Sequence, residues 1–281
     1  MPSFRSAACV WPAALLIVVA SLALPVYGDD AWPEAWSFWA VHDPQSSQIV
    51  DHSSWQAFLD DHLKPHADGI HRLAYQAAAA TDAECLQTYL NALAAIDPRT
   101  LNRDEQFAYW VNLYNALTVQ LVMAHPEEKG IKQMGGSFLP FGPWDDELIQ
   151  IAGQPVTLND IEHRILRPIW RDPRIHYAVN CASLSCPRLS LQAFTAANIE
   201  SLLDAGERYY INHPRGVEII NHKHLRLSSI YQWYQRDFGD SERDLLAYLG
   251  RFHPHLAEST DDVKMRIDYV YDWSLNSVRP R

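Results

Sequence analysis

The sequence lacks the short glycine-containing motifs that mark several large enzyme classes. No P-loop, no dinucleotide-binding fingerprint and no G-x-S-x-G elbow occurs in its 281 residues. These absences disfavour P-loop nucleotide hydrolysis, hydride transfer on a Rossmann domain and serine-hydrolase chemistry. Histidines reach ligand-like spacing only in pairs, such as His62 and His66, whereas a zinc site needs three or four ligands. We therefore expect no metal and no other cofactor.

The chain also has no internal repeat, no low-complexity tract and no long polar linker. Hydrophobic residues make up 48% of it, with 10 tryptophans and 13 tyrosines, which indicates a folded and well-buried core. The length suffices for one large domain or two small ones, at ~100–200 residues per domain.

Positive charge is scarce. The chain has 23 basic against 34 acidic residues, a net charge of −11. Such a surface repels phosphate backbones, so nucleic acid is not the expected partner.

The N-terminus reads as an export signal. Arg5 is the only charged residue before residue 29, and an apolar run covers 13–24. The segment 25–28, which ends at Gly28, offers small residues at the positions that a signal peptidase reads. The run is shorter than the ~20 apolar residues that span a bilayer, so we expect no stable membrane span in the mature form. We expect cleavage near Gly28 and a periplasmic or secreted protein; the alternative is an uncleaved N-terminal anchor. The expected division is a signal peptide (1–28), an N-terminal helical region (29–101), a core domain (102–276) and a tail (277–281).

Cysteine is rare as well. Cys9 lies in the predicted signal peptide, which leaves Cys85, Cys181 and Cys186. An odd count in an exported protein leaves at least one thiol free or paired between chains. Cys181 and Cys186 would close a small disulfide loop if their α-carbons lie within ~7 Å.

Hydrophobic periodicity and capping patterns predict a helix-rich α+β single domain with short antiparallel hairpins and few signs of parallel βαβ units. Thr81 and Glu84 form a capping-box pattern, Asn159 is placed to cap a short helix ending before Pro168, and Ser229 to cap another. Helices are expected at 54–64, 81–96, 103–123, 159–167, 195–211, 229–239 and 241–252; hairpins at 148–158 and 216–227; and strands at 175–179 and 266–271.

The stretch RIHYAVNCASLSCPRL, residues 174–189, is the most informative. The predicted strand at 175–179 delivers Cys181 into an Ala-Ser-Leu-Ser turn, and Cys186 follows before Pro187. A thiol at the end of a buried strand can act as a nucleophile, but two thiols this close can equally form a disulfide.

Five segments in this order resemble the domain of unknown function 547 family, an uncharacterised set of bacterial exported and plant proteins. They are FAYWVNLYNALTVQLV, PFGPWDDELIQIAGQPVTLNDIEHRILRP, RIHYAVNCASLSCPRL, LSSIYQWYQRDFG and YDWSLN, and they cover roughly 102–276. The resemblance implies motif positions at Asn112, Asn115, Glu162, His163, Arg167, Cys181 and Ser229, but no reaction.

Thiol acyl-transfer chemistry needs a thiolate, a base, a group that orients the base and donors for an oxyanion. Cys181 is the expected nucleophile. In an extended strand His176 would lie ~16 Å from it, so we expect His163 to be the base. Its orienter would be Asn112 or Asn115 from the long buried helix, or Asn159, four residues before it.

The remaining candidates are assigned to the substrate or to structure. We expect three residues to bind substrate: Trp144, Ser183 and Arg167. Trp144 lies in an aromatic loop with Phe138 and Phe141. Glu162 would be a structural acceptor, for Arg167 or for Arg174.

The sequence therefore predicts an exported cysteine-dependent acyl-transfer or hydrolase-type enzyme acting on an amide or thioester of a peptide or envelope component. Its fold would be thiol-protease-like or transglutaminase-like with an altered topology, because His163 precedes the cysteine. The alternative is a non-catalytic binding or scaffold domain with a Cys181–Cys186 disulfide. Asn112, Asn115 and His163 would then be buried polar groups satisfied by their surroundings.

Overall fold

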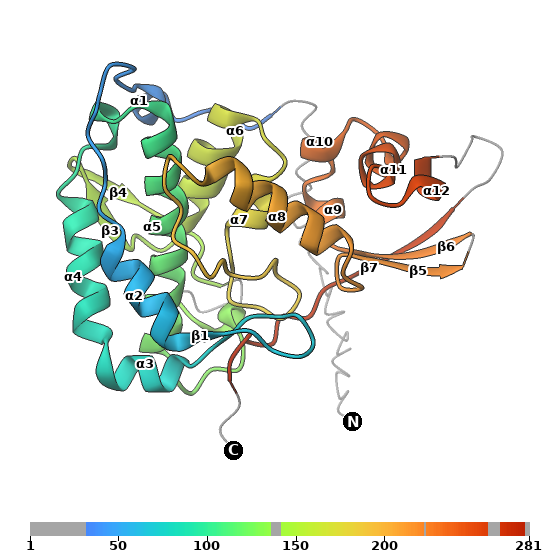
Figure 1. Ribbon diagram of the computed structural model, residues 1–281, viewed down its shortest axis with the longest axis horizontal. Coiled ribbons are helices and arrows are strands. Elements are labelled where there is room, and N and C mark those ends of the chain that lie inside the picture. The colour runs from blue at the N-terminus through green and yellow to red at the C-terminus, as the bar shows by residue number, and fades with distance from the viewer. Residues whose placement is uncertain (1–31, 136–141, 222, 258–264, 279–281) are drawn as a thin grey trace, which may run out of the picture.

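A computed structural model describes residues 32–135, 142–221, 223–257 and 265–278. The predicted signal peptide, with Cys9, and the loop residues Phe138 and Phe141 lie outside these ranges. The described part is a helix-rich α+β fold with short sheets, as the sequence predicts (Figure 1).

Helices make up most of the first half. In chain order the elements are α1 (Ser37–Ala40), α2 (Ser53–His62), β1 (Leu63–Lys64), β2 (Arg72–Leu73), α3 (Tyr75–Thr81), α4 (Ala83–Ala94), the 3₁₀ turn η1 (Pro98–Thr100), α5 (Arg103–Ala124) and the 3₁₀ turn η2 (Ile131–Gln133).

The second half mixes short helices with strands. It comprises β3 (Ile149–Ile151), β4 (Gln154–Val156), the π-helix η3 (Asp160–Leu166), α6 (Arg167–Trp170), α7 (Ile175–Ala178), α8 (Ile199–Ile211), β5 (Val217–Asn221), β6 (His224–Ser228), α9 (Ile230–Trp233), α10 (Gln235–Phe238), α11 (Glu242–Gly250), α12 (Pro254–Ala257) and β7 (Arg266–Val270).

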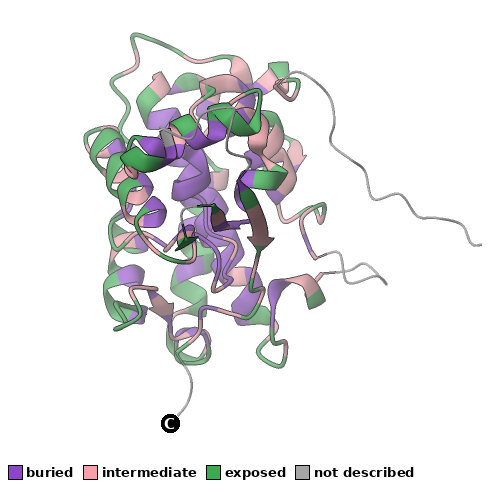
Figure 2. Cartoon of the chain, turned by 90° about the vertical axis from the view of Figure 1, so that its right-hand side faces the viewer, coloured by how far each residue is buried: buried purple, intermediate pink, exposed green. Residues whose placement is uncertain are grey.

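Helix α5 forms the centre of the larger core. Its residues are apolar on nearly every side, and those from 105 to 119 are all buried, as are 121–123. The side chain of Asn102 caps it by accepting from the backbone of Glu105, which satisfies one of the free N–H groups at its start. Helices α3 and α4 and the π-helix η3 pack against it, and α2 packs against α3 and α4. Figure 2 shows buried residues concentrated in the interior segments. The predicted helix at 103–123 is confirmed.

Both predicted hairpins form. Strands β3 and β4 turn at Ala152 and Gly153, which both have positive φ, one residue before the predicted turn. Strands β5 and β6 pair antiparallel, and β7 adds to β6 in parallel. This parallel pair is not predictable from a βαβ pattern, because its connection consists of the short helices α9–α12 rather than one crossover helix.

The predicted strand at 175–179 is wrong, because these residues begin with the helical turn α7. Asp172 accepts a hydrogen bond from the backbone of Arg174, and Pro173 supplies a fixed φ at the first turn. This Asp-Pro start signal outweighs the β-branched residues that follow it. The ~16 Å separation expected between His176 and Cys181 therefore does not apply.

The predicted cap of the next helix upstream is also wrong. Asn159 lies inside the helix and makes no capping bond. Thr157 and Asp160 cap it instead, each side chain accepting from the other's backbone N–H. The helix continues past Pro168 into α6, because the proline falls in the first turn of that element.

Three further helix starts differ from the prediction. Thr81 ends α3 and bonds back to Ala77, so no capping box forms with Glu84. Helix α8 begins at Ile199, four residues later than expected. Ser229 precedes α9 but its side chain makes no cap bond, whereas Ser241 caps α11 as predicted.

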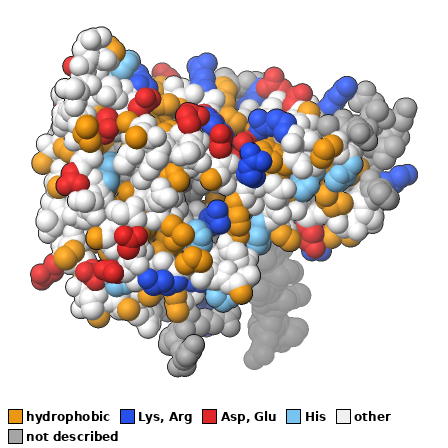
Figure 3. All heavy atoms as spheres, viewed as in Figure 1, with side chains coloured by type: hydrophobic (Ala, Val, Ile, Leu, Met, Phe, Trp, Pro, Cys, Tyr) orange, Lys and Arg blue, Asp and Glu red, His pale blue; other side chains and the backbone are white. Residues whose placement is uncertain are grey.

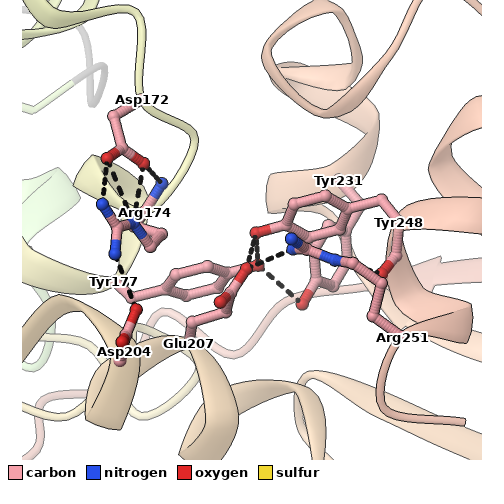
Figure 4. A network of polar contacts seen from close by, with 8 residues as sticks. All are labelled: Asp172, Arg174, Tyr177, Asp204, Glu207, Tyr231, Tyr248 and Arg251. Atoms are coloured by element: carbon pink, nitrogen blue, oxygen red, sulfur yellow. Dashed lines mark hydrogen bonds and ion pairs between the residues drawn. The ribbon is translucent and has the colours of Figure 1, made fainter.

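A polar network joins the larger core to a second hydrophobic cluster under α11 and β5–β7 (Figure 4). The hydroxyls of Tyr231 and Tyr248 each lie 3.4 Å from that of Tyr177 on α7. Glu207 of α8 accepts from Tyr248 and from Arg251, both at 2.5 Å. These contacts tie α7 and α8 to the C-terminal helices, so the short α7 is held from both sides.

Candidate active site

One cavity of about 200 Å³ lies where the π-helix, α7, α9 and the C-terminal segment meet. Its walls are mostly aromatic, with one thiol pair and a few titratable groups. It is lined by Tyr114, Trp144, Asn159, Glu162, His163, His176, Val179, Cys181, Cys186, Pro187, Ile230, Trp233, Tyr234, Tyr271 and Trp273. Cys181, His163 and Trp144, expected to form a site, thus share one cavity.

The C-terminal segment fixes the Cys181 turn. Leu184 donates its backbone N–H to Ser274 at 2.7 Å, and Asn276 donates to Ala182 at 2.9 Å. Ala182 has a φ of 60°, a left-handed conformation that the neighbouring contacts must hold. The YDWSLN segment therefore clamps the turn that carries the thiol.

The Cys181 thiol is partly exposed and surrounded by donors. Its Sγ lies 3.0 Å from the hydroxyl of Tyr271 and 3.2 Å from that of Ser183, which itself donates to Tyr271 at 3.0 Å. Burial alone would raise the pKa of Cys181. Hydrogen bonds with Cys186, Ser183 and Tyr271 outweigh it and lower that pKa to about 7. A thiol with this pKa is about half ionised near neutral pH.

Cys181 and Cys186 are both free thiols in the structure, as is the exposed Cys85. The backbone N–H of Cys181 donates to Sγ of Cys186 at 3.0 Å. Burial raises the pKa of Cys186 well above its ordinary value, and the neighbouring Cys181 adds to this. The two sulfurs therefore differ in pKa: that of Cys181 is lowered and that of Cys186 is raised.

His163 lies on the π-helix η3, one turn before Arg167. The guanidinium of Arg167 donates to Nδ1 of His163 at 3.1 Å, which confirms that the two share a helix face. An arginine can only donate, so Nδ1 must accept, and the proton of the neutral imidazole sits on Nε2. Burial lowers the pKa of His163, and the charge of Arg167 acts in the same direction. His163 is therefore a neutral N–H donor rather than the resting-state base that the sequence suggests.

A chain of buried charges lies behind His163. Arg167 binds Asp237 of α10 through two hydrogen bonds of 2.6 and 2.9 Å. His176 Nε2 lies 2.6 Å from the same carboxylate, and its Nδ1 lies 3.6 Å from Glu162. Tyr114 of α5 donates to Glu162 at 3.1 Å.

Charge pairing sets the protonation of this chain. Burial opposes ionisation of both carboxylates, but their cationic neighbours lower the pKa of Glu162 and of Asp237 to about 2. Burial likewise lowers the pKa of His176, yet its bonds to Asp237 and Glu162 prevail and raise it. The expectation that Glu162 accepts from Arg167 or Arg174 is wrong, because its partners are Tyr114 and His176.

The two asparagines of α5 hold backbone. Asn115 donates to the carbonyl of Ala178 and accepts from the N–H of Asn180, at 3.0 and 2.8 Å. Asn112 bonds in the same two ways to Phe194, at 2.8 and 3.0 Å. Neither amide contacts His163, so neither orients it directly. Asn115 instead fixes the segment that leads into Cys181.

The remaining predicted site residues lie in or beside the cavity. Trp144 lines it, whereas Ser183 is buried behind the thiol and Arg167 behind His163. Asn159 lines the cavity but its amide donates to Asp145. Ser229 lies next to the cavity residue Ile230 and donates its backbone N–H to Val270.

Sequence reasoning missed four groups of this site. Tyr271, Asp237 and Tyr114 come from segments far from Cys181 in the chain. All three lie inside segments that carry the family resemblance, which was the one signal that could have found them. His176 was set aside because of the incorrect strand, although Asp172-Pro173 offered a readable signal for a helix start.

The structure bears on membrane and metal sites only within its described ranges. There, no helix combines the length and hydrophobicity needed to cross a membrane. Nor do three or more histidine, cysteine, aspartate or glutamate side chains gather in those ranges as ligands for a metal.

Comparison with known proteins places the chain by family alone. No curated protein and no solved structure matches it. Residues 98–211 match the model of a family described as "Protein of unknown function, DUF547". The match covers α5, the π-helix, α7 and α8, and so includes Asn112, Asn115, His163 and Cys181. The similarity of this chain to the DUF547 family therefore rests on this segment.

Proposed function

We propose that this protein is a cysteine-dependent acyl-transfer or hydrolase-type enzyme with Cys181 as its nucleophile. The observation that carries the proposal is the partly exposed thiol of Cys181. It lies in the wall of an aromatic cavity and its pKa is lowered to about 7 by the groups that bond it. A structural thiol buried in apolar surroundings would have a raised pKa, as Cys186 does.

In the first half-reaction the thiolate of Cys181 adds to the carbonyl carbon of the acyl substrate. The carbonyl π electrons move to oxygen, and the oxyanion accepts a hydrogen bond from Nε2–H of His163. Collapse of this intermediate breaks the bond to the leaving group and leaves the acyl group on Cys181 as a thioester. The leaving group takes a proton from solvent where its basicity requires one.

In the second half-reaction water or an acceptor nucleophile adds to the carbonyl carbon of the acyl-enzyme and releases a proton to solvent. The C–S bond breaks and Cys181 returns as a thiolate, because its pKa makes it a good leaving group. In this scheme Tyr271 donates to the thiolate in both halves through the contact of 3.0 Å, and Ser183 supports it by donating to the Tyr271 hydroxyl at 3.0 Å.

The substrate is an amide or thioester of a peptide or envelope component, and Trp144 is one of its contacts in the cavity. Leader-like residues 1–28 support a role in the periplasm or outside the cell. An aromatic-lined cavity suits the apolar part of an acyl group or a side chain better than it suits a highly charged group.

The test is covalent trapping. Purified protein is incubated with a panel of acyl thioesters and peptide amides, and each cysteine-containing peptide is weighed by mass spectrometry. An acyl adduct on Cys181 that disappears in Cys181→Ser supports the proposal.

Cys85→Ser serves as the matched control, because Cys85 is exposed and lies outside the cavity. If no substrate acylates Cys181, and iodoacetamide labels it no faster than Cys85, the proposal fails. A Cys181–Cys186 disulfide in protein isolated without reductant from its native compartment would also contradict it.

A further inference from the structure

A second region of the molecule has the features of an anion site. Two hollows of about 200 and about 640 Å³ adjoin on the face that carries α8, and they share Arg188 and Ala205 in their walls. On this face Figure 3 shows a hollow near the centre with basic and histidine side chains gathered beside it. No residue lines both one of these hollows and the Cys181 cavity, although the chain neighbours Pro187 and Arg188 lie on opposite sides.

Arg188 is the central group. Its guanidinium lies 3.6 Å from the ring centre of Tyr209 on α8, and the side chain is half-buried. Among the described residues it has no hydrogen bond and no carboxylate partner. Burial lowers the pKa of Arg188, and the nearby charge of Arg215 lowers it further. A half-buried guanidinium without a carboxylate is uncommon, since buried charges are normally paired.

Arg215 adds a second cation with unused donors. Its Nη1 donates to the carbonyl of Leu184 at 3.2 Å. Its Nε and Nη2 are buried and have no partner among the described residues. Its guanidinium stands 5.8 Å from the ring centre of Tyr209, the ring on which Arg188 lies.

Two histidines complete the cluster. His71 donates from Nδ1 to the carbonyl of Leu189 at 2.6 Å, so its Nε2 is open to a ligand. His213 donates from Nε2 to the carbonyl of Asp68 at 2.8 Å. Burial lowers the pKa of both, and Arg188 and Arg215 act in the same direction.

The nearby carboxylates are already engaged. Asp68 binds Arg72 and His66, and Asp204 binds Arg174 at 2.6 Å. The cluster thus keeps positive charge unbalanced within a chain of net charge −11.

We propose that Arg188, which lines both hollows beside α8, binds a phosphate-type oxyanion there, separate from the Cys181 cavity. Arg215 lines neither hollow but faces the same Tyr209 ring, and it adds a second positive charge to the site. The planar fork of an arginine matches the oxygens of phosphate, and His71 would offer a further donor when protonated. This site goes beyond the proposed acyl-transfer function and does not depend on it.

The test is calorimetric titration of the full chain with inorganic phosphate at low ionic strength, with chloride at equal ionic strength as the blank. We expect saturable binding of one phosphate, weakened about tenfold or more in Arg188→Gln and less in Arg188→Lys, which keeps the charge. A parallel titration with glycerol 3-phosphate distinguishes a free phosphate from a phosphate monoester, and binding of either supports the site.

Arg99→Gln is the matched control. Arg99 also lies over an aromatic ring, Phe38 at 4.1 Å, but it is paired with Asp97 and lies away from the hollows. The proposal is overturned if neither anion binds the wild-type chain, or if Arg188→Gln and Arg99→Gln bind phosphate equally well. Titration of Cys181→Ser separates the two proposals, since loss of the nucleophile should leave phosphate binding unchanged.

Discussion

Arg167 donates a hydrogen bond to Nδ1 of His163 at 3.1 Å while it holds Asp237 with its Nε and Nη2. The histidine thus stands at the end of a buried chain in which carboxylates and cations alternate. Because the arginine can only donate, it sets the tautomer of the imidazole and keeps it neutral. Arg167 therefore decides that His163 presents a neutral Nε2–H donor in the cavity.

The first prediction concerns this contact. In Arg167→Gln we expect the pKa of His163 to rise, because a positive charge that now lowers it is removed. Arg167→Lys keeps the charge and should give a smaller rise. Titration of the imidazole proton signals by NMR measures both. Arg164→Gln, an exposed arginine on the same helix paired with Asp160, should leave the titration unchanged. An unchanged or lowered pKa in Arg167→Gln would contradict the assigned tautomer.

The second prediction concerns the thiol. Wild-type Cys181 should be alkylated by iodoacetamide with a midpoint near pH 7. Tyr271→Phe removes a donor to the thiolate, and a hydrogen bond to a charged group contributes about 1.5–3 kcal/mol, or about one to two pKa units. The rate at pH 7 should therefore fall about five- to fiftyfold.

The control for the thiol is Tyr269→Phe, which alters a half-buried tyrosine two residues away from Tyr271 that makes no hydrogen bond to Cys181. Its alkylation profile should match that of the wild type. Equal profiles for the two variants would mean that Tyr271 does not stabilise the thiolate.

The third prediction concerns stability and pH. The pKa of Asp237 is lowered from 3.8 to about 2. Its pairing therefore stabilises the fold at pH values above about 4, and this stabilisation is lost as the pH falls from about 4 towards 2. The pKa of His176 is raised, so its contribution is full below 6.5 and is lost as pH rises through the folded value. Asp237→Asn leaves two buried cations without their carboxylate and should cost about 3–5 kcal/mol of unfolding free energy.

Urea unfolding at pH 3, 5 and 9 measures this effect. The loss in Asp237→Asn should be largest near pH 5, where both partners are charged. Asp240→Asn changes an exposed carboxylate paired with Arg236 and should shift stability by less than about 0.5 kcal/mol. A loss in Asp237→Asn that is the same at all three pH values would argue against a paired charge.

The sequence predicts the parts of this fold that depend on local signals. Helix α5 follows from its apolar run, and the β3–β4 hairpin from Gly153. The strand predicted at 175–179 is wrong, because the helix-start signal of Asp172-Pro173, which is equally local, outweighs the hydrophobic run after it. Cys181 and His163 were found through a family pattern, and the structure places both in one cavity.

The rest of the site could not be predicted, because tertiary packing assembles it. Tyr271 lies 90 residues after Cys181, and Asp237 lies 61 residues after His176. Glu162 was expected to be only a structural acceptor, yet it lies on the π-helix beside His163 and lines the same cavity.

The fourth prediction separates the two asparagines of α5. Both are buried, lie one helical turn apart and bond twice to backbone, so each should be similarly costly to remove. Asn112→Ala and Asn115→Ala should each lose about 1–3 kcal/mol per backbone group left unpaired. Only Asn115 holds Ala178 and Asn180, the residues before Cys181. Asn115→Ala should therefore also slow alkylation of Cys181, whereas Asn112→Ala should lose stability and keep the wild-type rate. Measuring unfolding and alkylation on both variants checks this, and equal alkylation rates would show that Asn115 has no part in positioning the thiol.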